Sequence, residues 1–182
     1  MMEIVHVELI EAPTDKDWME VKRRALVTGW LKPVNQPTSQ WKRAVLKARH
    51  SPIRRLVYSF YIEGIPYCNS VHLCRHVHLQ PFVASQRNDR QKMYDRNSAP
   101  QNAPVNMIVD VNAEMLMVLA NKRLCHQADE ETRYIVQLMC TLAEKHTPEL
   151  KGLLVPMCFA NYGHCNELKP CGKYLEYVEE EL

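Results

Sequence analysis

Residues 107–145 read MIVDVNAEMLMVLANKRLCHQADEETRYIVQLMCTLAEK, and this stretch decides the fold class. Residues 107–111 predict a short strand, and residues 112–124, which are dense in Leu, Met and Val, predict a helix. A second helix is predicted over residues 129–145, where one helical stripe carries Thr132, Ile135, Met139 and Leu142. A strand followed by two helices with apolar faces indicates helices packed on a sheet.

Two stretches nearer the N-terminus predict further strands. Residues 3–10 alternate as a strand does, with Val5, Val7 and Leu9 on one face. Residues 56–62, LVYSFYI, are rich in β-branched and aromatic residues, and Gly64 is expected to end that strand.

Capping residues mark further helices. Thr14 is followed three residues later by an acid, which predicts a helix over residues 16–27 that stops at Gly29. Ser39 is expected to cap a helix over residues 40–49. Pro66 suits the first turn of a helix that carries Arg75.

These elements predict an α/β (α+β) fold with helices packed on a small mixed or antiparallel sheet. Residues 1–182 are expected to form a single domain. Residues 85–105 are polar and interrupted by prolines, as in a connection between elements. Residues 152–182 are expected to be a cysteine-containing loop that ends in an acidic tail over residues 176–182.

Composition narrows the classes of function. A net charge of +2 is too small for binding duplex nucleic acid, and no apolar run is long enough to cross a bilayer. The N-terminus, MMEIVHVELIEAP, lacks the basic and apolar regions of a signal peptide. The seven cysteines are an odd number, which indicates a reducing compartment. We therefore expect a cytoplasmic protein with no membrane partner.

The residues with the clearest chemistry form the segment RHVHLQPFVASQR, residues 75–87. Arg75 and His76 are expected on a helix. Seven residues, 78–84, separate Val77 from Ser85, Gln86 and Arg87, which are expected on the following loop. Guanidinium groups hold phosphate oxygens with paired hydrogen bonds, and a serine hydroxyl and backbone N–H groups complete such a site. The pattern predicts an anion site, with ordinary surface ion pairs as the alternative.

This pattern resembles that of the flavin-dependent thymidylate synthases, which carry Arg-His-Arg, seven residues and then Ser-x-Arg. The chain is similar to that family in two further segments, so that the resemblance covers about half of it. Upstream, Ser51-Pro52 leads into the strand at residues 56–62. Downstream, VNAEMLMVLANKRLCHQADEE supplies Asn112, Ala113, Arg123, Ala128 and Glu131 at the family's spacing.

The resemblance implies a shortened, divergent enzyme that reductively methylates dUMP to dTMP. The family uses methylenetetrahydrofolate as donor, NADPH as reductant and FAD as hydride carrier, so dUMP and folate are the implied small-molecule partners. Arg123 would be the catalytic residue, because an arginine favours ionisation of the uracil ring. The nucleotide would be bound by His72, Arg75, Ser85, Gln86, Arg87 and Arg123. The flavin would contact Ser51, Arg75, His76 and Asn112.

The chain departs from the family on the flavin side. Val77 replaces the third residue of Arg-His-Arg, Phe82 and Val83 replace an Asn-Glu pair, and Glu114 and Val118 replace an arginine and an asparagine. FAD is therefore expected to bind more loosely than in the family. Two alternatives keep the nucleotide site without flavin: a nucleotide-modifying transferase, and a non-catalytic pyrimidine-nucleotide-binding protein.

Two further expectations concern assembly and metals. The family builds each site from several subunits, so the resemblance implies a homo-oligomer, a tetramer in particular. Near the C-terminus, Cys158, His164, Cys165 and Cys171 are candidate ligands of a structural zinc ion. The alternative is a packed cysteine-containing loop, because the paired spacing of zinc knuckles is missing.

Overall fold

The computed structural model describes residues 5–174 and shows helices packed on a four-stranded antiparallel sheet of order β1-β2-β4-β3. The strands are β1 (His6–Glu11), β2 (Val57–Pro66), β3 (Gln80–Val83) and β4 (Pro104–Asn112). The predicted fold class, with an antiparallel sheet, is therefore confirmed. The predicted acidic tail, residues 176–182, lies outside the described residues.

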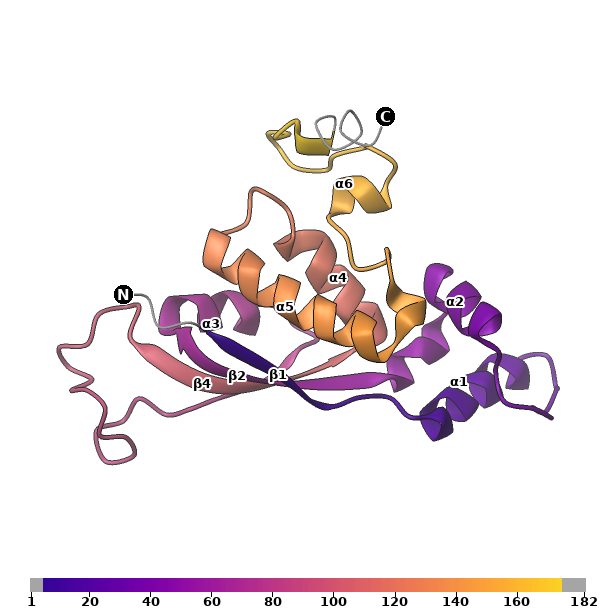
Figure 1. The fold of residues 1–182 in the computed structure, drawn as a ribbon, viewed down its shortest axis with the longest axis horizontal. Helices are drawn as coiled ribbons and strands as arrows, with labels where there is room; N and C mark the ends of the chain where they lie inside the picture. The colour runs from indigo at the N-terminus through magenta and orange to yellow at the C-terminus, as the bar shows by residue number, and fades with distance from the viewer. Residues whose placement is uncertain (1–4, 175–182) are drawn as a thin grey trace.

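The helices gather on one face and at one end of the sheet. They are α1 (Asp15–Val27), α2 (Ser39–Lys47), α3 (Tyr67–Cys74), α4 (Ala113–Arg123), α5 (Glu130–His146) and α6 (Met157–Ala160), with 3₁₀ turns η1 (Ser51–Arg55) and η2 (Pro148–Leu150). Figure 1 shows α4 and α5 side by side above the sheet, α1 and α2 at one end, and α6 beyond α4. None of the helices within residues 5–174 has both the length and the apolar character to cross a membrane.

The core lies between β4 and the two helices that follow it. Alternate residues of β4 are buried, and the residues between them are half-buried. The buried side of α4 includes Leu116 and Leu119, and the predicted stripe of α5 is buried at Thr132, Ile135 and Met139. Burying such apolar surface is the main favourable contribution to folding, so this layer holds the two helices in place.

The caps agree with the sequence in most places. Thr14 and Asp17 form the predicted capping box at the start of α1. At α2 the prediction was wrong by one residue, since the Thr38 hydroxyl accepts the hydrogen bond from the Trp41 N–H and Ser39 is already helical. Asn112 caps α4 and Asp129 caps α5.

Gly64 does not end the second strand, which corrects the prediction. The register of β2 against β4 shifts between Ile62 and Ile65, and the strand then continues to Pro66. Gly64 has a φ of 72°, which a glycine adopts without strain, and its N–H donates to Asn106 Oδ1 at 3.0 Å. A β-bulge therefore replaces the expected break.

The segment around residue 75 also differs from the prediction. Helix α3 ends at Cys74, so Arg75 is the C-cap residue and does not project from the helix. Strand β3 had not been predicted and takes up part of the seven-residue gap, pairing with β4 from Gln80 to Val83.

Tyr58 offers a test of the packing between β2 and the end of α5. Its side chain is fully buried, burial raises the pKa of its hydroxyl, and that hydroxyl donates to Thr147 Oγ1 at 2.9 Å. Tyr58→Phe is expected to lower the free energy of unfolding by about 1–2 kcal/mol, because the buried Thr147 hydroxyl loses a partner. Urea denaturation measures this, with the exposed Tyr134→Phe as control; equal midpoints for the two variants would contradict it.

Candidate functional site

The candidate site centres on Arg123, the last residue of α4. Its Nε donates to His76 Nε2 at 2.8 Å, and its Nη2 donates to the carbonyl oxygen of His72 at 3.0 Å. Both acceptors belong to α3 and the residues that follow it, so the end of one helix fixes the guanidinium of the other. A guanidinium has five N–H groups, so about three remain for a ligand.

Positive charge accumulates here at Arg75 and Arg123. Burial lowers the pKa of Arg123, the charge of Arg75 lowers it further, and Asp129 acts in the opposite direction. Among the ion pairs of the described residues, none includes Arg75 or Arg123. Two neighbouring guanidiniums, one of them half-buried, favour an anionic ligand.

His76 is held neutral beside these cations. Because the Arg123 N–H donates to Nε2, the neutral ring carries its proton on Nδ1. Burial, followed by the charge of Arg123, lowers the pKa of His76. The site therefore gains a fixed imidazole without a third positive charge.

The second half of the arginine motif lies apart from this cluster. Ser85, Gln86 and Arg87 follow β3, where the exposed Arg87 pairs with Asp89 through contacts of 2.9 and 2.7 Å. The Ser85 hydroxyl accepts from the Arg87 backbone N–H, and the Gln86 amide donates to the Tyr94 hydroxyl. None of the hydrogen bonds among the described residues joins these residues to Arg75 or Arg123.

The predicted flavin contacts divide between the two ends of α4. Asn112 caps the start of the helix, with its side-chain oxygen 3.0 Å from the Met115 nitrogen, and Ser51 begins η1, which packs against α4. Arg75 and His76 lie at the other end, near Arg123. Helix α4 has 11 residues, so about 16 Å separates its ends. One chain does not bring the four residues together.

Glu114 is not an isolated negative charge. Its carboxylate forms an ion pair with the guanidinium of Arg54 in η1. The Arg54 side chain is 62% exposed, and that of Glu114 is 16% exposed. The charge reversal that the sequence shows at residue 114 is therefore neutralised inside the chain. Of the other departures, Val77 and Phe82 are exposed apolar side chains, whereas Val83 and Val118 are half-buried.

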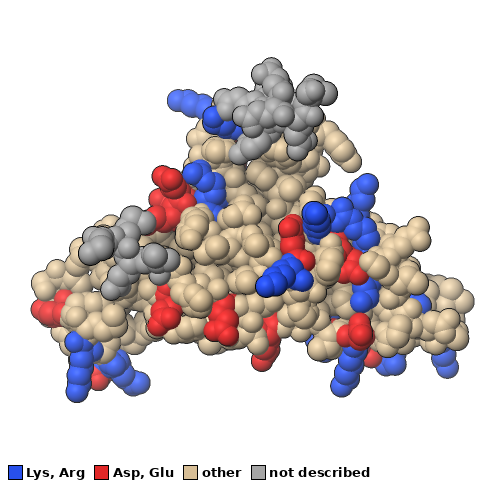
Figure 2. Space-filling view, viewed as in Figure 1, with Lys and Arg blue, Asp and Glu red and all other residues tan. Residues whose placement is uncertain are grey.

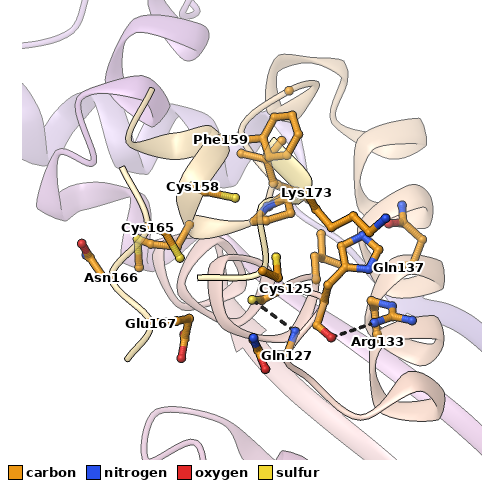
Figure 3. A pocket seen from close by; sticks show the side chains of 18 of the residues that line it. Cys125, Gln127, Arg133, Gln137, Cys158, Phe159, Cys165, Asn166, Glu167 and Lys173 are labelled. Carbon is orange, nitrogen blue, oxygen red and sulfur yellow. Dashed lines mark hydrogen bonds between the residues drawn. The ribbon is translucent and has the colours of Figure 1, made fainter. Parts of the chain in front are cut away.

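The C-terminal cysteines Cys158, Cys165 and Cys171 line a cavity of about 730 Å³. Figure 3 shows Cys125, Cys158 and Cys165 around it, with Arg133 of α5 on another wall. Burial raises the pKa of the Cys158 thiol, and His164 is not part of the lining. Within residues 5–174, no three His, Cys, Asp or Glu side chains gather as metal ligands. The described residues therefore do not form the zinc site considered for Cys158, His164, Cys165 and Cys171.

Sequence reasoning missed a polar cluster beside Arg123, which joins the buried Asn69 and Thr132 to the half-buried His72 and the exposed Asp129. Asp129 three residues before Thr132 is a helix-start pattern, but that signal identifies a cap and not the contacts made across the fold.

On the face of the molecule shown in Figure 2, basic and acidic side chains are interspersed. The cationic feature of the site is a local pair of arginines, which suits a small anion better than a polymer.

Comparisons with known proteins give one family match over part of the chain and solved structures of similar fold. A model of the family described as thymidylate synthase complementing protein matches residues 94–149, which include Asn112, Arg123 and Thr132. No curated protein sequence gives a match. Thymidylate synthase X from Helicobacter pylori, solved with FAD and dUMP, has a TM-score of 0.65 and 14% identity over 83% of this chain and 99% of that chain.

A second solved structure with the same fold is the UMP/dUMP methylase PolB from Streptomyces cacaoi, bound with 5-Br dUMP. Its TM-score is 0.65 at 15% identity, over 82% of this chain and 94% of that chain. These likenesses confirm the predicted fold and, with the family match, the resemblance stated from the sequence. The chain is similar in sequence to the thymidylate synthase complementing protein family over residues 94–149, and it has the fold of thymidylate synthase X.

Proposed function

We propose that this chain binds a pyrimidine nucleoside monophosphate, dUMP in particular, and methylates its base as a flavin-dependent thymidylate synthase-like enzyme. The observation that carries the proposal is the Arg123 guanidinium, held by His72 and His76 beside Arg75, with no ion pair to a carboxylate among residues 5–174. Both similar structures were solved with a uracil nucleotide, which supports the choice of ligand.

The chemistry of the cluster suits this substrate. A uracil ring that loses its N3 proton carries negative charge on its carbonyl oxygens, and a fixed guanidinium stabilises that charge. Arg123 needs little reorganisation to do so, because two of its N–H groups are already held by His72 and His76. Arg75 is then available for the phosphate.

For the cofactor we propose FAD, with NADPH as reductant and methylenetetrahydrofolate as donor. FAD would supply hydride transfer. The chain retains Ser51, His76 and Asn112 as polar contacts, and the Asn112 amide nitrogen stays available because only its oxygen caps α4. Val77 and Phe82 cannot hydrogen-bond a flavin, and the Arg54–Glu114 pair is neutral overall. The residues fit a flavin that is bound weakly.

The same observations favour one second candidate, a nucleotide-modifying or nucleotide-binding protein on this scaffold without flavin. The loss of polar side chains at Val77, Phe82, Val83 and Val118 falls mainly on the flavin side, although the glutamate of the replaced Asn-Glu pair contacts both ligands in the family. Arg123 remains, and a protein that bound phosphate alone would not need it at the base.

We further propose a homotetramer in which neighbouring chains complete each site. Support comes from the distance between the ends of α4, which separates Ser51 and Asn112 from Arg123, and from the absence of described hydrogen bonds between Arg87 and the Arg75–Arg123 cluster. Closed symmetric assemblies are common among oligomers.

Thermal denaturation with a panel of ligands tests the proposed function. We expect dUMP and UMP to raise the melting temperature, FAD to raise it less, and a purine monophosphate to leave it unchanged. No shift with any pyrimidine monophosphate would reject the proposal. Shifts with nucleotides but none with FAD at any concentration would favour the flavin-free alternative.

The Arg54–Glu114 pair yields a separate prediction about flavin. Glu114→Arg changes the local charge of the pair from neutral to twofold positive, so FAD should bind about three- to tenfold more tightly at low salt and show a smaller gain at high salt. A flavin fluorescence titration measures this.

The matched control is the double exchange Arg54→Glu with Glu114→Arg, which restores an ion pair. It should leave FAD affinity near that of the unchanged protein. If the exchange tightens binding as much as Glu114→Arg alone, the net charge at this position is not the cause.

A further inference from the structure

Thr132 is the buried centre of a hydrogen-bond network that links α3 to the start of α5. Its side chain is fully buried, and Oγ1 lies 2.9 Å from Asp129 Oδ2, 3.0 Å from Asn69 Nδ2 and 3.1 Å from His72 Nδ1. The Asn69 amide also donates to Asp129 at 2.6 Å. No buried polar side-chain atom among the described residues lacks a partner, so the network is satisfied.

The number of protons in the network determines the direction of each bond. Although burial raises the pKa of Asp129, hydrogen bonds from Thr132, together with the nearby His72 and Asn69, lower it overall, so this group is a carboxylate and only accepts. The single hydroxyl proton of Thr132 is therefore donated to Asp129. The Thr132 oxygen accepts from Asn69, and for the same reason it must accept from His72 Nδ1.

This arrangement has two consequences for His72. The neutral ring carries its proton on Nδ1, which leaves Nε2 as an acceptor, and none of the described residues hydrogen-bonds Nε2. The backbone carbonyl of the same residue accepts from Arg123 Nη2. The network thus orients the ring of His72, and the backbone carbonyl of the same residue holds the guanidinium.

We propose that Thr132 is a positioning residue that fixes the Nδ1–H tautomer of His72, so that Nε2 accepts a hydrogen bond from an O–H or N–H donor of the bound nucleotide. This inference rests on the proposed function, since it assigns a ligand donor to that same site. Thr132 acts only through His72 and does not touch the nucleotide.

Thr132→Val tests the proposal, because it removes the hydroxyl and keeps the side-chain volume, and Thr132→Ser is the control that restores the hydroxyl. Long-range ¹H–¹⁵N correlation spectra of the histidine rings report the tautomer, with the His72 signals assigned by comparison with His72→Gln. We expect the Nδ1–H pattern in the unchanged protein and in Thr132→Ser, and its loss in Thr132→Val. Calorimetry should show dUMP binding to Thr132→Val weakened about tenfold, and to Thr132→Ser nearly unchanged.

The outcomes separate this inference from the proposed function. An Nε2–H pattern for neutral His72 in the unchanged protein overturns the inference, even if dUMP binds. Equal dUMP affinity of Thr132→Val and the unchanged protein also overturns it. If Thr132→Val does not fold, the His72 tautomer in the unchanged protein and in Thr132→Ser still tests the inference, because both proteins must show the Nδ1–H pattern. If no pyrimidine monophosphate binds the unchanged protein, the proposed function fails, and the acceptor role of His72 fails with it.

Discussion

Arg123→Gln is expected to weaken dUMP binding by about 2–4 kcal/mol, or roughly 30- to 1,000-fold. The variant removes the half-buried cation that faces the proposed ligand, and with it the donors to His76 and to the His72 carbonyl. Hydrogen bonds to charged groups contribute more than neutral ones, so this loss should exceed that of other single substitutions in the site. Isothermal titration calorimetry with dUMP measures it.

Lys122→Gln is the matched control, because it removes a positive charge from the adjacent, exposed position of α4. That variant should bind dUMP nearly as well as the unchanged protein, since exposed ion pairs contribute little. Arg123→Lys keeps the charge but loses the paired geometry, so it should resemble Arg123→Gln more than the control. Equal losses in Lys122→Gln and Arg123→Gln would mean that net charge alone governs binding.

Mixing the variants Arg87→Ala and Arg123→Gln should restore dUMP binding at some sites, if Arg87 of one subunit and Arg123 of another bind the same nucleotide. Arg87→Ala alone is expected to weaken binding by about 2–4 kcal/mol, through loss of a charge-assisted phosphate contact. In a random mixture with Arg123→Gln, about one quarter of the sites would then combine both native arginines. Calorimetry after the chains have exchanged counts these sites.

The two variants kept apart provide the control, since neither should show sites of native affinity. Light scattering on the same samples reports whether the chains associate. A monomer at micromolar concentration, or a mixed oligomer without restored sites, would contradict the shared site and place Arg87 outside it.

Local patterns in the sequence were enough to predict most of the fold. The strand and helices of residues 107–145 follow from their periodicity and from the caps Asn112 and Asp129, which act within one turn. Strand β3 was missed because four residues, one of them a proline, carry little periodic signal, and its order depends on pairing with β4. The continuation of β2 through Gly64 likewise depends on Asn106, a residue from another strand.

The residues of the candidate site could be predicted only from the resemblance to the family, and only at positions that match the family's motifs. Arg123, His76, His72 and Arg75 lie close together, whereas Ser51 and Asn112 lie at the far end of α4. The ion pair that neutralises Glu114 joins residues 60 apart, and so does the network around Thr132. Contacts of that range are set by packing, and a single sequence does not encode them in any local pattern.

Calorimetric titration of the unchanged protein with dUMP, beside deoxyuridine, tests the central claim most directly. The Arg75–Arg123 cluster predicts saturable binding of dUMP at one site per chain, and binding of the nucleoside weaker by about 2 kcal/mol or more, because it lacks the phosphate for the arginines. Absence of dUMP binding, or equal affinity for dUMP and deoxyuridine, would contradict the account of this cluster as a nucleotide monophosphate site.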